Sequence, residues 1–386
     1  MRFPLLLLTI LPPLLAGCGS RQPPAVTPAA QTGKTTGSPD AASQTGKTTG
    51  TSPVAGSNNV PPTIEKPPAT KPSVEPTKPT PEASVLRKLA AKLVEKTPDG
   101  LWRINEAAAL EMEKQESSAR AELVTLMHDP DPQVRRGSAY YLLASFNPND
   151  KSQVEAYSAL LDDADANLRT LGLQAVRQMH AADQLSAVPR LTTMLTKQTE
   201  ASADNRASLA RFLGSLKAGG QPALDALITA AKEDESPKAR GACLVAISQI
   251  APPEEAIPAY RAGLADAEGS VRLVAVARLR QLGAKAIPAA GELAQALDDG
   301  DPRLGKDIRE AAAETLILLG KDAVPYLEKP LSGSSKTAKL LALACLGKIG
   351  TAAKEALPLA KECLTDSDPQ VQKLAEAVVK ILGSAP

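Results

Sequence analysis

The residues that could carry out chemistry are few in this chain of 386 residues. Its two histidines, His128 and His180, lie neither in a His-Glu pair nor in the i, i+4 spacing that holds zinc on one face of a helix. Nucleophilic catalysis by serine or cysteine needs a histidine base beside the nucleophile, and so few histidines provide no such arrangement. We therefore expect no catalytic site, no metal site and no cofactor.

The four cysteines are the remaining candidates for covalent or redox chemistry. Cys243, Cys345 and Cys363 lie within apolar runs, where a buried thiol behaves as a small hydrophobic side chain. Cys345 and Cys363 fall on successive expected helices, and an exported protein can form disulfides, so a bond between these two stays open. Cys18 lies in a different setting, close to the N-terminus.

A recurring arginine could suggest a row of anion-binding sites. It is the second residue of a pair that returns at steps of about 30–37 residues, the length of a two-helix solenoid repeat. The pairs are Val134-Arg135, Leu168-Arg169, Asn205-Arg206, Ala239-Arg240, Val271-Arg272 and Ile308-Arg309, followed by Ala338-Lys339 and Val371-Gln372.

The residues before each pair predict the start of a helix. Three positions earlier the chain mostly has side chains that cap helix N-termini, namely Asp131, Asp165, Ser202, Ser236, Glu268, Ser335 and Asp368. Proline follows directly in three repeats, at the first helical position, where its missing N–H costs nothing. In the Ile308 repeat, Asp301-Pro302 stands about one turn earlier, so we expect that helix to begin a turn sooner.

Helix ends and a second helix complete each repeat. The helix that contains the arginine pair is expected to end at a glycine in several repeats. These C-capping glycines are Gly214, Gly283, Gly320, Gly350 and Gly383. The other helix is expected to open at an apolar-proline pair: Val188-Pro189, Ile257-Pro258, Ile287-Pro288, Val324-Pro325 or Leu357-Pro358. A single helical hairpin cannot bury its apolar face alone, so neighbours must stack. The expected fold is all-α, an α-solenoid of about eight helical hairpins.

These motifs resemble those of the HEAT-repeat superfamily, which has an armadillo-type fold. The Asp-x-x-Val-Arg motif from Asp131 to Arg135, Leu-Gly at helix ends and the proline of the other helix are similar to the HEAT-like repeats named after phycobilisome lyases. The resemblance covers about residues 82–386. It implies that the arginines form a structural ladder by bonding the acidic loop residue of a neighbouring repeat, here Asp131, Asp165 or Glu268. The ladder residues are Arg135, Arg169, Arg206, Arg240, Arg272 and Arg309.

The side of each helix one residue past the ladder is expected to be more exposed and to face the concave surface of the solenoid. Tyrosine and arginine are enriched at interface hot spots, so we expect a surface there that binds a protein or peptide. Its candidate residues are Arg136, Tyr140, Gln174, Arg177 and Arg211, with Arg280 and Glu314 on the same side. A net charge of +1 and an aromatic content of 2% do not favour nucleic acid as a partner.

The N-terminal residues predict export and a lipid anchor. Phe3 to Leu15 form an apolar run that is too short to span a membrane and is typical of a signal peptide. Leu15, Ala16, Gly17 and Cys18 resemble the lipobox of bacterial lipoproteins, which implies cleavage before Cys18 and lipidation of its thiol. The expected location is the cell envelope, on the extracytoplasmic side of a membrane. The outer membrane is favoured in a Gram-negative cell, since glycine follows the cysteine.

The chain is therefore expected to contain a signal peptide at 1–17 and a lipidated cysteine with a disordered tether at 18–81. A helical cap at 82–117 and the repeat solenoid at 118–386 follow. The tether is rich in Pro, Thr and Ser and poor in large apolar residues, so burial cannot offset its conformational entropy. The function we expect is a membrane-anchored scaffold or adaptor without catalysis of its own. The alternatives are a HEAT-like lyase or oxidoreductase related to phycobilin lyases, and a structural spacer of the envelope.

Overall fold

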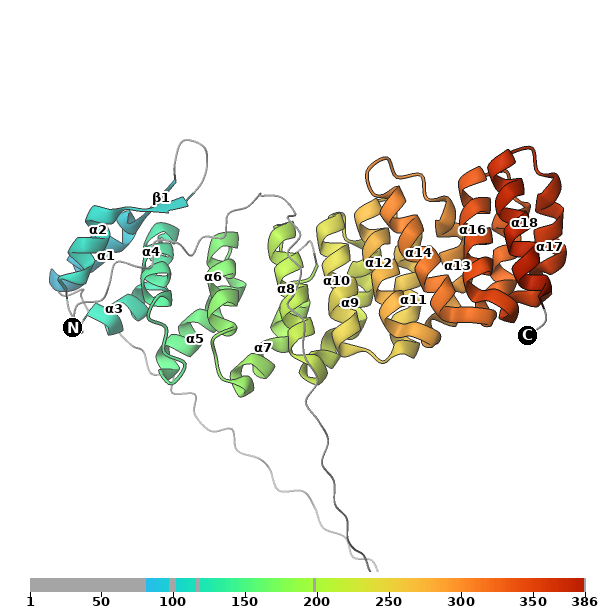
Figure 1. Ribbon diagram of the computed structural model, residues 1–386. Helices are drawn as coiled ribbons and strands as arrows, with labels where there is room; N and C mark the ends of the chain where they lie inside the picture. The colour runs from blue at the N-terminus through green and yellow to red at the C-terminus, as the bar shows by residue number, and fades with distance from the viewer. Residues whose placement is uncertain (1–80, 97–101, 116–118, 197–198, 385–386) are drawn as a thin grey trace, which may run out of the picture. The chain divides into compact units, whose positions relative to one another are not determined.

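The computed structural model describes residues 81–96, 102–115, 119–196 and 199–384 (Figure 1). The expected signal peptide, Cys18 and almost all of the expected tether lie outside these ranges, so the domain boundaries proposed for them stay predictions. Within these ranges, no helix is both long and apolar enough to cross a lipid bilayer.

The described residues form helices and one short β-hairpin. The α-helices and strands are α1 (Pro81–Leu93), β1 (Val94–Lys96), β2 (Trp102–Ile104), α2 (Glu106–Glu113), α3 (Ala119–Leu126), α4 (Pro132–Leu143), α5 (Lys151–Ala159), α6 (Ala166–Val176), α7 (Ala181–Thr193), α8 (Ala203–Ser215), α9 (Leu224–Glu233), α10 (Pro237–Ile250), α11 (Pro253–Leu264), α12 (Gly269–Leu282), α13 (Ala290–Gln295), α14 (Gly305–Leu319), α15 (Glu328–Ser332), α16 (Lys336–Ile349), α17 (Leu357–Glu362) and α18 (Pro369–Gly383). The 3₁₀ turns that the text uses are η2 (Lys217–Ala223), η3 (Gly283–Ala289) and η5 (Gly320–Leu327).

From α3 onward the helices pair into successive hairpins, α3 with α4 through α17 with α18. Helices α8, α10, α12, α14, α16 and α18 each pack against the next, and α9, α11, α13, α15 and α17 form a second row in the same way. Figure 1 shows the even-numbered helices following one another in chain order. The described part of the chain is thus an α-solenoid of eight helical hairpins, as the repeat pattern predicted.

Most of the predicted helix starts are confirmed by their capping bonds. The carboxylate of Asp131 accepts the N–H of Gln133, and the hydroxyl of Ser335 accepts that of Ala338. The Ile308 repeat was predicted wrongly, because α14 begins only four residues before its arginine, whereas the other helices of this row begin three before theirs. Asp301 instead accepts two N–H groups within a turn that precedes the helix.

The predicted glycine caps are confirmed in three repeats. Gly283, Gly320 and Gly350 directly follow α12, α14 and α16 with φ values of 56°, 64° and 72°. Glycine adopts this left-handed region without strain because it has no Cβ atom.

Gly214 and Gly383 do not cap helices as predicted. Gly214 lies inside α8, where a Cβ atom would stand 2.8 Å from Cα of Ala246 on α10, so it permits close packing instead. Gly383 is the last helical residue of α18. The left-handed position after α8 is taken by Lys217, with φ 52°. A side chain there is strained, since its Cβ atom approaches the backbone.

The apolar-proline pairs were also placed wrongly. Only Leu357-Pro358 opens a helix, α17. Pro189 and Pro258 lie inside α7 and α11, whereas Pro288 and Pro325 lie in the turns η3 and η5. Pro189 and Pro258 are exposed, so the carbonyl that each leaves without a donor can be hydrated, which lowers the cost of proline in a helix.

The N-terminal cap, expected to be helical over residues 82–117, also contains two short strands. Leu86, Ala90 and Leu93 are buried on one face of α1, but the helix ends at Leu93. Residues 94–96 pair antiparallel with residues 102–104, so the described chain is not purely α-helical.

Small side chains let the rows approach closely around one continuous core. Almost all of the buried apolar residues form a cluster that extends from Leu86 to Leu382 and is rich in alanine and leucine. Leu93, Val94 and Ala108 form a small second cluster in the cap. At the contact between α1 and α4, a Cβ atom on Gly137 would lie 1.9 Å from the carbonyl oxygen of Ala90. The backbones of the cap and the first repeat therefore touch directly.

Candidate functional site

The arginine column holds neighbouring repeats together through a repeated set of bonds, which we call a rung. In the rung of Arg135, Nε and Nη2 donate to the carboxylate of Asp163 at 2.7 and 2.9 Å. Nη1 donates to the carbonyl oxygens of Asp129 and Pro130 in the preceding loop. The N–H of Asp165 donates to the same Asp163 carboxylate, so one guanidinium joins two consecutive loops.

The same arrangement recurs along the described chain. The first-named residue donates to the acid of the next loop in the pairs Arg87–Asp129, Arg135–Asp163, Arg169–Glu200, Arg206–Asp234, Arg240–Asp266, Arg272–Asp299 and Lys339–Asp366. The arginines of these pairs make bidentate, charge-assisted bonds, which are both directional and strong, whereas Lys339 makes a single bond. The rungs therefore use the arginine column to join repeats.

The partner acids differ from those that were expected. Except in the rung of Arg272, each rung uses the acid two residues before the helix N-cap and not the N-cap itself, which in α12 is Glu268. The acid of the Arg272 rung, Asp299, lies two residues before Asp301 and five before Leu304, the N-cap of α14. The reason is that the N-cap carboxylates bond the first turn of their own helix, as Asp131 and Asp165 do. Asp165 is also bonded by Arg136, the residue next to the rung arginine.

Burial and hydrogen bonding act in opposite directions on the rung acids. Burial raises the pKa of Glu200, but the bonds from Arg169, from the N–H of Ser202 and from Asn205 outweigh it, so the pKa lies below its ordinary value. The bond to Glu200 raises the pKa of Arg169. Both groups are thus charged at neutral pH, and the charges compensate each other.

The rung of Arg309 is incomplete. Its Nη1 donates to the carbonyl oxygen of Asp299, the same anchor that the other arginines use. The position two residues before the next N-cap, Ser335, is Gly333, which has no side chain to complete the rung. Among the described residues, no carboxylate pairs with this arginine, although it was expected to belong to the ladder with the others.

Two candidate partner-binding residues are less accessible than expected. The side chain of Arg136 is 8% exposed, and its guanidinium carbon lies 3.9 Å from the ring centroid of Trp102. Tyr140 is half-buried, and burial raises its pKa. The expected exposed side of α4 is covered because the β-hairpin of the cap packs over it, which repeat spacing alone does not reveal.

The other three candidates are exposed: Gln174 lies on α6, Arg177 directly follows this helix, and Arg211 lies on α8. Nη2 of Arg177 donates to the carbonyl oxygen of Ser208, and Nη2 of Arg211 donates to the Ser208 hydroxyl. The two arginines therefore flank one residue. Partial desolvation by the surrounding protein and the charge of Arg211 lower the pKa of Arg177, although its side chain reaches solvent. Gln174 lies one turn before Arg177 on α6. These residues form a small cationic surface across two neighbouring repeats.

The residues first considered for chemistry are dispersed. His128 and His180 are both exposed, and Nε2 of His180 lies 3.1 Å from Oδ1 of Asn149. Cys243, Cys345 and Cys363 are buried and carry free thiols. Burial raises the pKa of Cys243 and of Cys345 to about 12. In the ranges that the structure describes, no cluster of His, Cys, Asp and Glu is placed to hold a metal ion.

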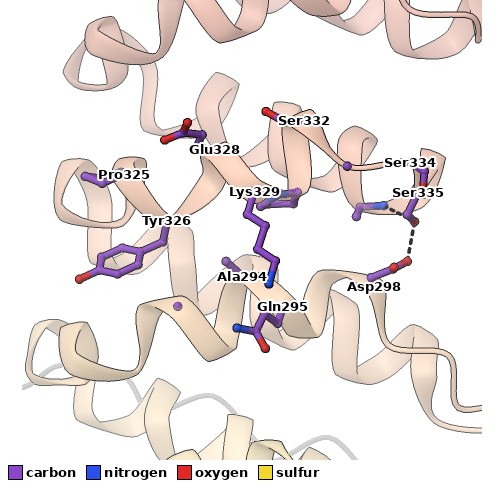
Figure 2. A pocket seen from close by; sticks show the side chains of 14 residues that line it. Ala294, Gln295, Asp298, Pro325, Tyr326, Glu328, Lys329, Ser332, Ser334 and Ser335 are labelled. Atoms are coloured by element: carbon purple, nitrogen blue, oxygen red, sulfur yellow. Dashed lines mark hydrogen bonds between the residues drawn. The ribbon is translucent and has the colours of Figure 1, made fainter.

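An open groove of about 830 Å³ lies between α13 and the η5–α15 segment, beside the start of α16. Tyr326 is exposed at its wall. Figure 2 shows the side chains of Lys329 and Gln295 facing each other across the groove, and the hydroxyl of Ser335 donating to Asp298.

This groove was not predicted, although the sequence carries a signal for it. The step from Arg309 to Lys339 is 30 residues, the shortest of the series. Gly333, which lines the groove, stands where the other loops have an acid. The short repeat could have been noticed in the sequence. The absence of an acid at Gly333 becomes significant only once the structure shows that the other rungs use an acid at this position.

Comparisons with known proteins give structural likenesses alone. No family model and no curated protein matches the chain. Similar solved structures include YibA of Escherichia coli, with 19% identity over 72% of this chain and 98% of that one, at a TM-score of 0.37. The complex of CpcE and CpcF of phycocyanin lyase from Nostoc has 19% identity over 68% of this chain and 94% of that one, at a TM-score of 0.32. Kap121p has 14% identity over 68% of this chain, at a TM-score of 0.37, and the match covers only 29% of Kap121p. At such values, nothing about ligand or activity follows for this chain.

Proposed function

We propose that this chain is a lipid-anchored, non-catalytic scaffold of the cell envelope that binds a protein or peptide along its stacked repeats. The binding side is the one expected to be concave, on the extracytoplasmic side of the membrane. The observation that carries this proposal is the row of helical hairpins joined by rungs. Such a row displays a long series of side chains at fixed spacing, and extended partners bind surfaces of this type.

The surface of α6 and α8 supports the proposal at the level of residues. Arg177 and Arg211 are exposed, and the bonds of each to Ser208 restrict their side chains before any partner arrives. Cationic side chains that are already restricted lose less conformational entropy on binding. We expect an acidic segment of the partner to bind here.

A cross-linked capture from a membrane extract tests the scaffold. The intact protein is compared with Arg177→Glu/Arg211→Glu and with a control, Lys232→Glu on α9, which makes a like charge reversal in the other row. We expect one protein to be captured by the intact chain and by the control, and to be lost from the double variant. A partner retained by the double variant would place the binding surface elsewhere, and the failure to capture any partner would favour the spacer function.

The membrane anchor is supported by the residues Leu15 to Cys18 and is tested separately. Metabolic labelling with a radioactive fatty acid should label the intact protein and leave Cys18→Ser unlabelled. The variant should also move from the membrane fraction to the soluble fraction, because a lipid anchor supplies the membrane affinity. An unlabelled intact protein would refute the anchor without affecting the scaffold proposal.

A further inference from the structure

The loop before α16 lacks the bonds by which the complete rungs join two repeats. In a complete rung the acid accepts two bonds from the guanidinium and one from the N–H two residues further on, as Asp163 does. The corresponding loop position here is Gly333. Among the described residues, Nε and Nη2 of Arg309 and the N–H of Ser335 therefore have no hydrogen-bond acceptor.

The residue that follows this loop does not compensate for the missing bonds. In the complete rungs, Nη1 of the arginine six residues after the acid donates to two carbonyl oxygens of its own loop. The residue six positions after Gly333 is Lys339, which bonds Asp366 of the next repeat and, among the described residues, no carbonyl of its own loop. The hydroxyl of Ser335 donates to Asp298 of the preceding repeat, but this bond is exposed. At this level of the ladder, one exposed bond thus stands in place of a rung.

The second row of helices is also weakly built at this junction. Helix α13 has 6 residues and α15 has 5, whereas α9 and α11 have 10 and 12. The open groove of about 830 Å³ lies between α13 and α15, so the side chains of the two repeats do not fill the space there (Figure 2). A junction with fewer bonds and looser packing couples its neighbours less strongly, because a solenoid is held together by contacts between adjacent repeats.

The residue type, and not the backbone, accounts for the missing acid. Gly333 has φ and ψ of −71° and 178°, in the extended region that any residue adopts, and the rung acid Asp163 has −65° and 144°. A Cβ atom at Gly333 would have the carbonyl oxygen of Lys329 as its nearest neighbour, at 3.3 Å. This contact is close but needs only a small shift of an exposed loop, so a substitution can restore the acid.

We propose that the junction between α14 and α16 is a seam, at which the last two hairpins, residues 320–384, open from the rest of the solenoid as one unit. Opening here breaks one ladder bond, whereas opening at a complete rung breaks all the bonds of a buried guanidinium. Segments with fewer stabilising contacts open at a lower free energy than the whole domain. A seam of this kind lets one end of the solenoid move while the other repeats stay stacked. The inference follows from the bonding and does not rest on the scaffold function.

Two native cysteines report opening at two different junctions. Cys345 on α16 is fully buried, and its thiol donates to the carbonyl oxygen of Ala313 on α14, so it lies at the seam. Cys243 on α10 is 1% exposed and lies beside a complete rung, since the charges of Asp234 and Arg206 act on its pKa. Burial raises the pKa of both thiols to about 12, so a difference between their labelling rates reports opening and not thiol acidity.

The test labels the full chain with a thiol-specific alkylating reagent in the absence of denaturant. Mass spectrometry of the peptides that contain each cysteine gives the two labelling rates. We expect Cys345 to be modified at least about tenfold faster than Cys243, the factor that one charged hydrogen bond contributes. Equal rates would overturn the proposal, because both junctions would then open only when the whole chain unfolds.

Three variants connect the opening to the missing acid. Gly333→Asp supplies the acid and should slow the labelling of Cys345 at least about tenfold, with that of Cys243 unchanged. Gly333→Ala, which adds only the Cβ atom, should keep the wild-type rates. In Arg309→Gln/Gly333→Asp the new acid has no guanidinium partner, so most of the slowing should be lost. Unchanged labelling of Cys345 in Gly333→Asp, or slowing that persists without Arg309, would refute the assignment. A misfolded Gly333→Asp chain would label at both cysteines, and the wild-type rates then decide.

Hydrogen exchange measures how far the opening extends. The amides of α16 and α18 should exchange together in the wild type and should both be slowed by Gly333→Asp, whereas those of α8 and α10 should not change. A change confined to residues 333–335 would show a local effect on the loop and would refute the seam. Membrane capture tests the scaffold function separately, since its outcome has no bearing on these rates.

Discussion

Replacing Arg206 by methionine should destabilise the solenoid far more than breaking an exposed ion pair between the same two repeats. The Arg206 side chain is 1% exposed and that of its partner, Asp234, is 5% exposed. Nε and Nη2 donate to Asp234 at 2.7 and 2.8 Å, and Nη1 donates to the carbonyl oxygens of Glu200 and Ala201. Methionine keeps most of the apolar stem, so the variant removes four hydrogen bonds without opening a large cavity.

The expected loss of unfolding free energy follows from the buried carboxylate that the substitution leaves without its partner. Without the guanidinium, Asp234 keeps only the N–H of Ser236, and its charge remains buried. Removing one partner of a buried ion pair typically costs about 3–5 kcal/mol. The control is Lys238→Met, because Lys238 on α10 pairs with Asp204 on α8 at 2.6 Å, with side chains 50% and 60% exposed. An exposed pair contributes at most about 1 kcal/mol.

Urea unfolding followed by far-UV circular dichroism measures both variants against the wild type. We expect the Arg206→Met loss to exceed that of the control severalfold, and the transition to broaden if neighbouring repeats uncouple. A loss of no more than about 1 kcal/mol, equal to that of Lys238→Met, would refute the view that rungs hold the repeats together.

The pH dependence supplies a second check on the same rung. Burial raises the pKa of Asp234, but the bonds from Arg206 and Ser236 outweigh it, so the folded-state pKa lies below the ordinary 3.8. A depressed folded pKa stabilises the native state above the ordinary value, and this stability is lost as the pH falls through the folded pKa. The difference between wild type and Arg206→Met should therefore be largest near neutral pH and shrink in acid. A difference that stays constant down to strongly acidic pH would contradict this assignment.

Three further predictions concern the backbone and the thiols. Lys217→Gly should raise the free energy of unfolding by about 1 kcal/mol in thermal or urea unfolding, since Lys217 has a φ of 52° in a position that other repeats give to glycine; a loss of stability would contradict the strain. Gly137→Ala should lower it by about 2–3 kcal/mol, because the new methyl group would lie 1.9 Å from the carbonyl oxygen of Ala90; an unchanged midpoint would show that α1 shifts freely. Cys243, whose pKa burial raises to about 12, should react with a disulfide reagent at pH 8 only after unfolding, and rapid reaction of the native protein would refute its burial.

Local sequence determined the helical repeat. An N-capping side chain such as Asp131, proline at the first helical position and a buried stripe that includes Val134 and Leu142 act within one helix. The positions of α4 and its equivalents could therefore be predicted without knowing what packs against them. The recurrence of the pair that contains Arg135 then required stacking, because one hairpin cannot cover its own apolar face.

The roles of the other residues were decided by contacts between repeats. The sequence of one repeat does not determine the distances to its neighbours. Whether Gly214 ends a helix or lets α8 approach α10 depends on where Ala246 lies. Whether Arg136 is exposed depends on a β-hairpin that brings Trp102 over it.

The ladder shows the same division most clearly. Its arginines could be read from the sequence, but the acid that each one bonds lies in the next repeat, two residues before the N-cap that local rules suggested. Once that geometry is known, Gly333 stands out among the described loops as the position between complete rungs that leaves an arginine without its acid. A vacancy of this kind exists only relative to its neighbours, so tertiary structure alone could reveal it.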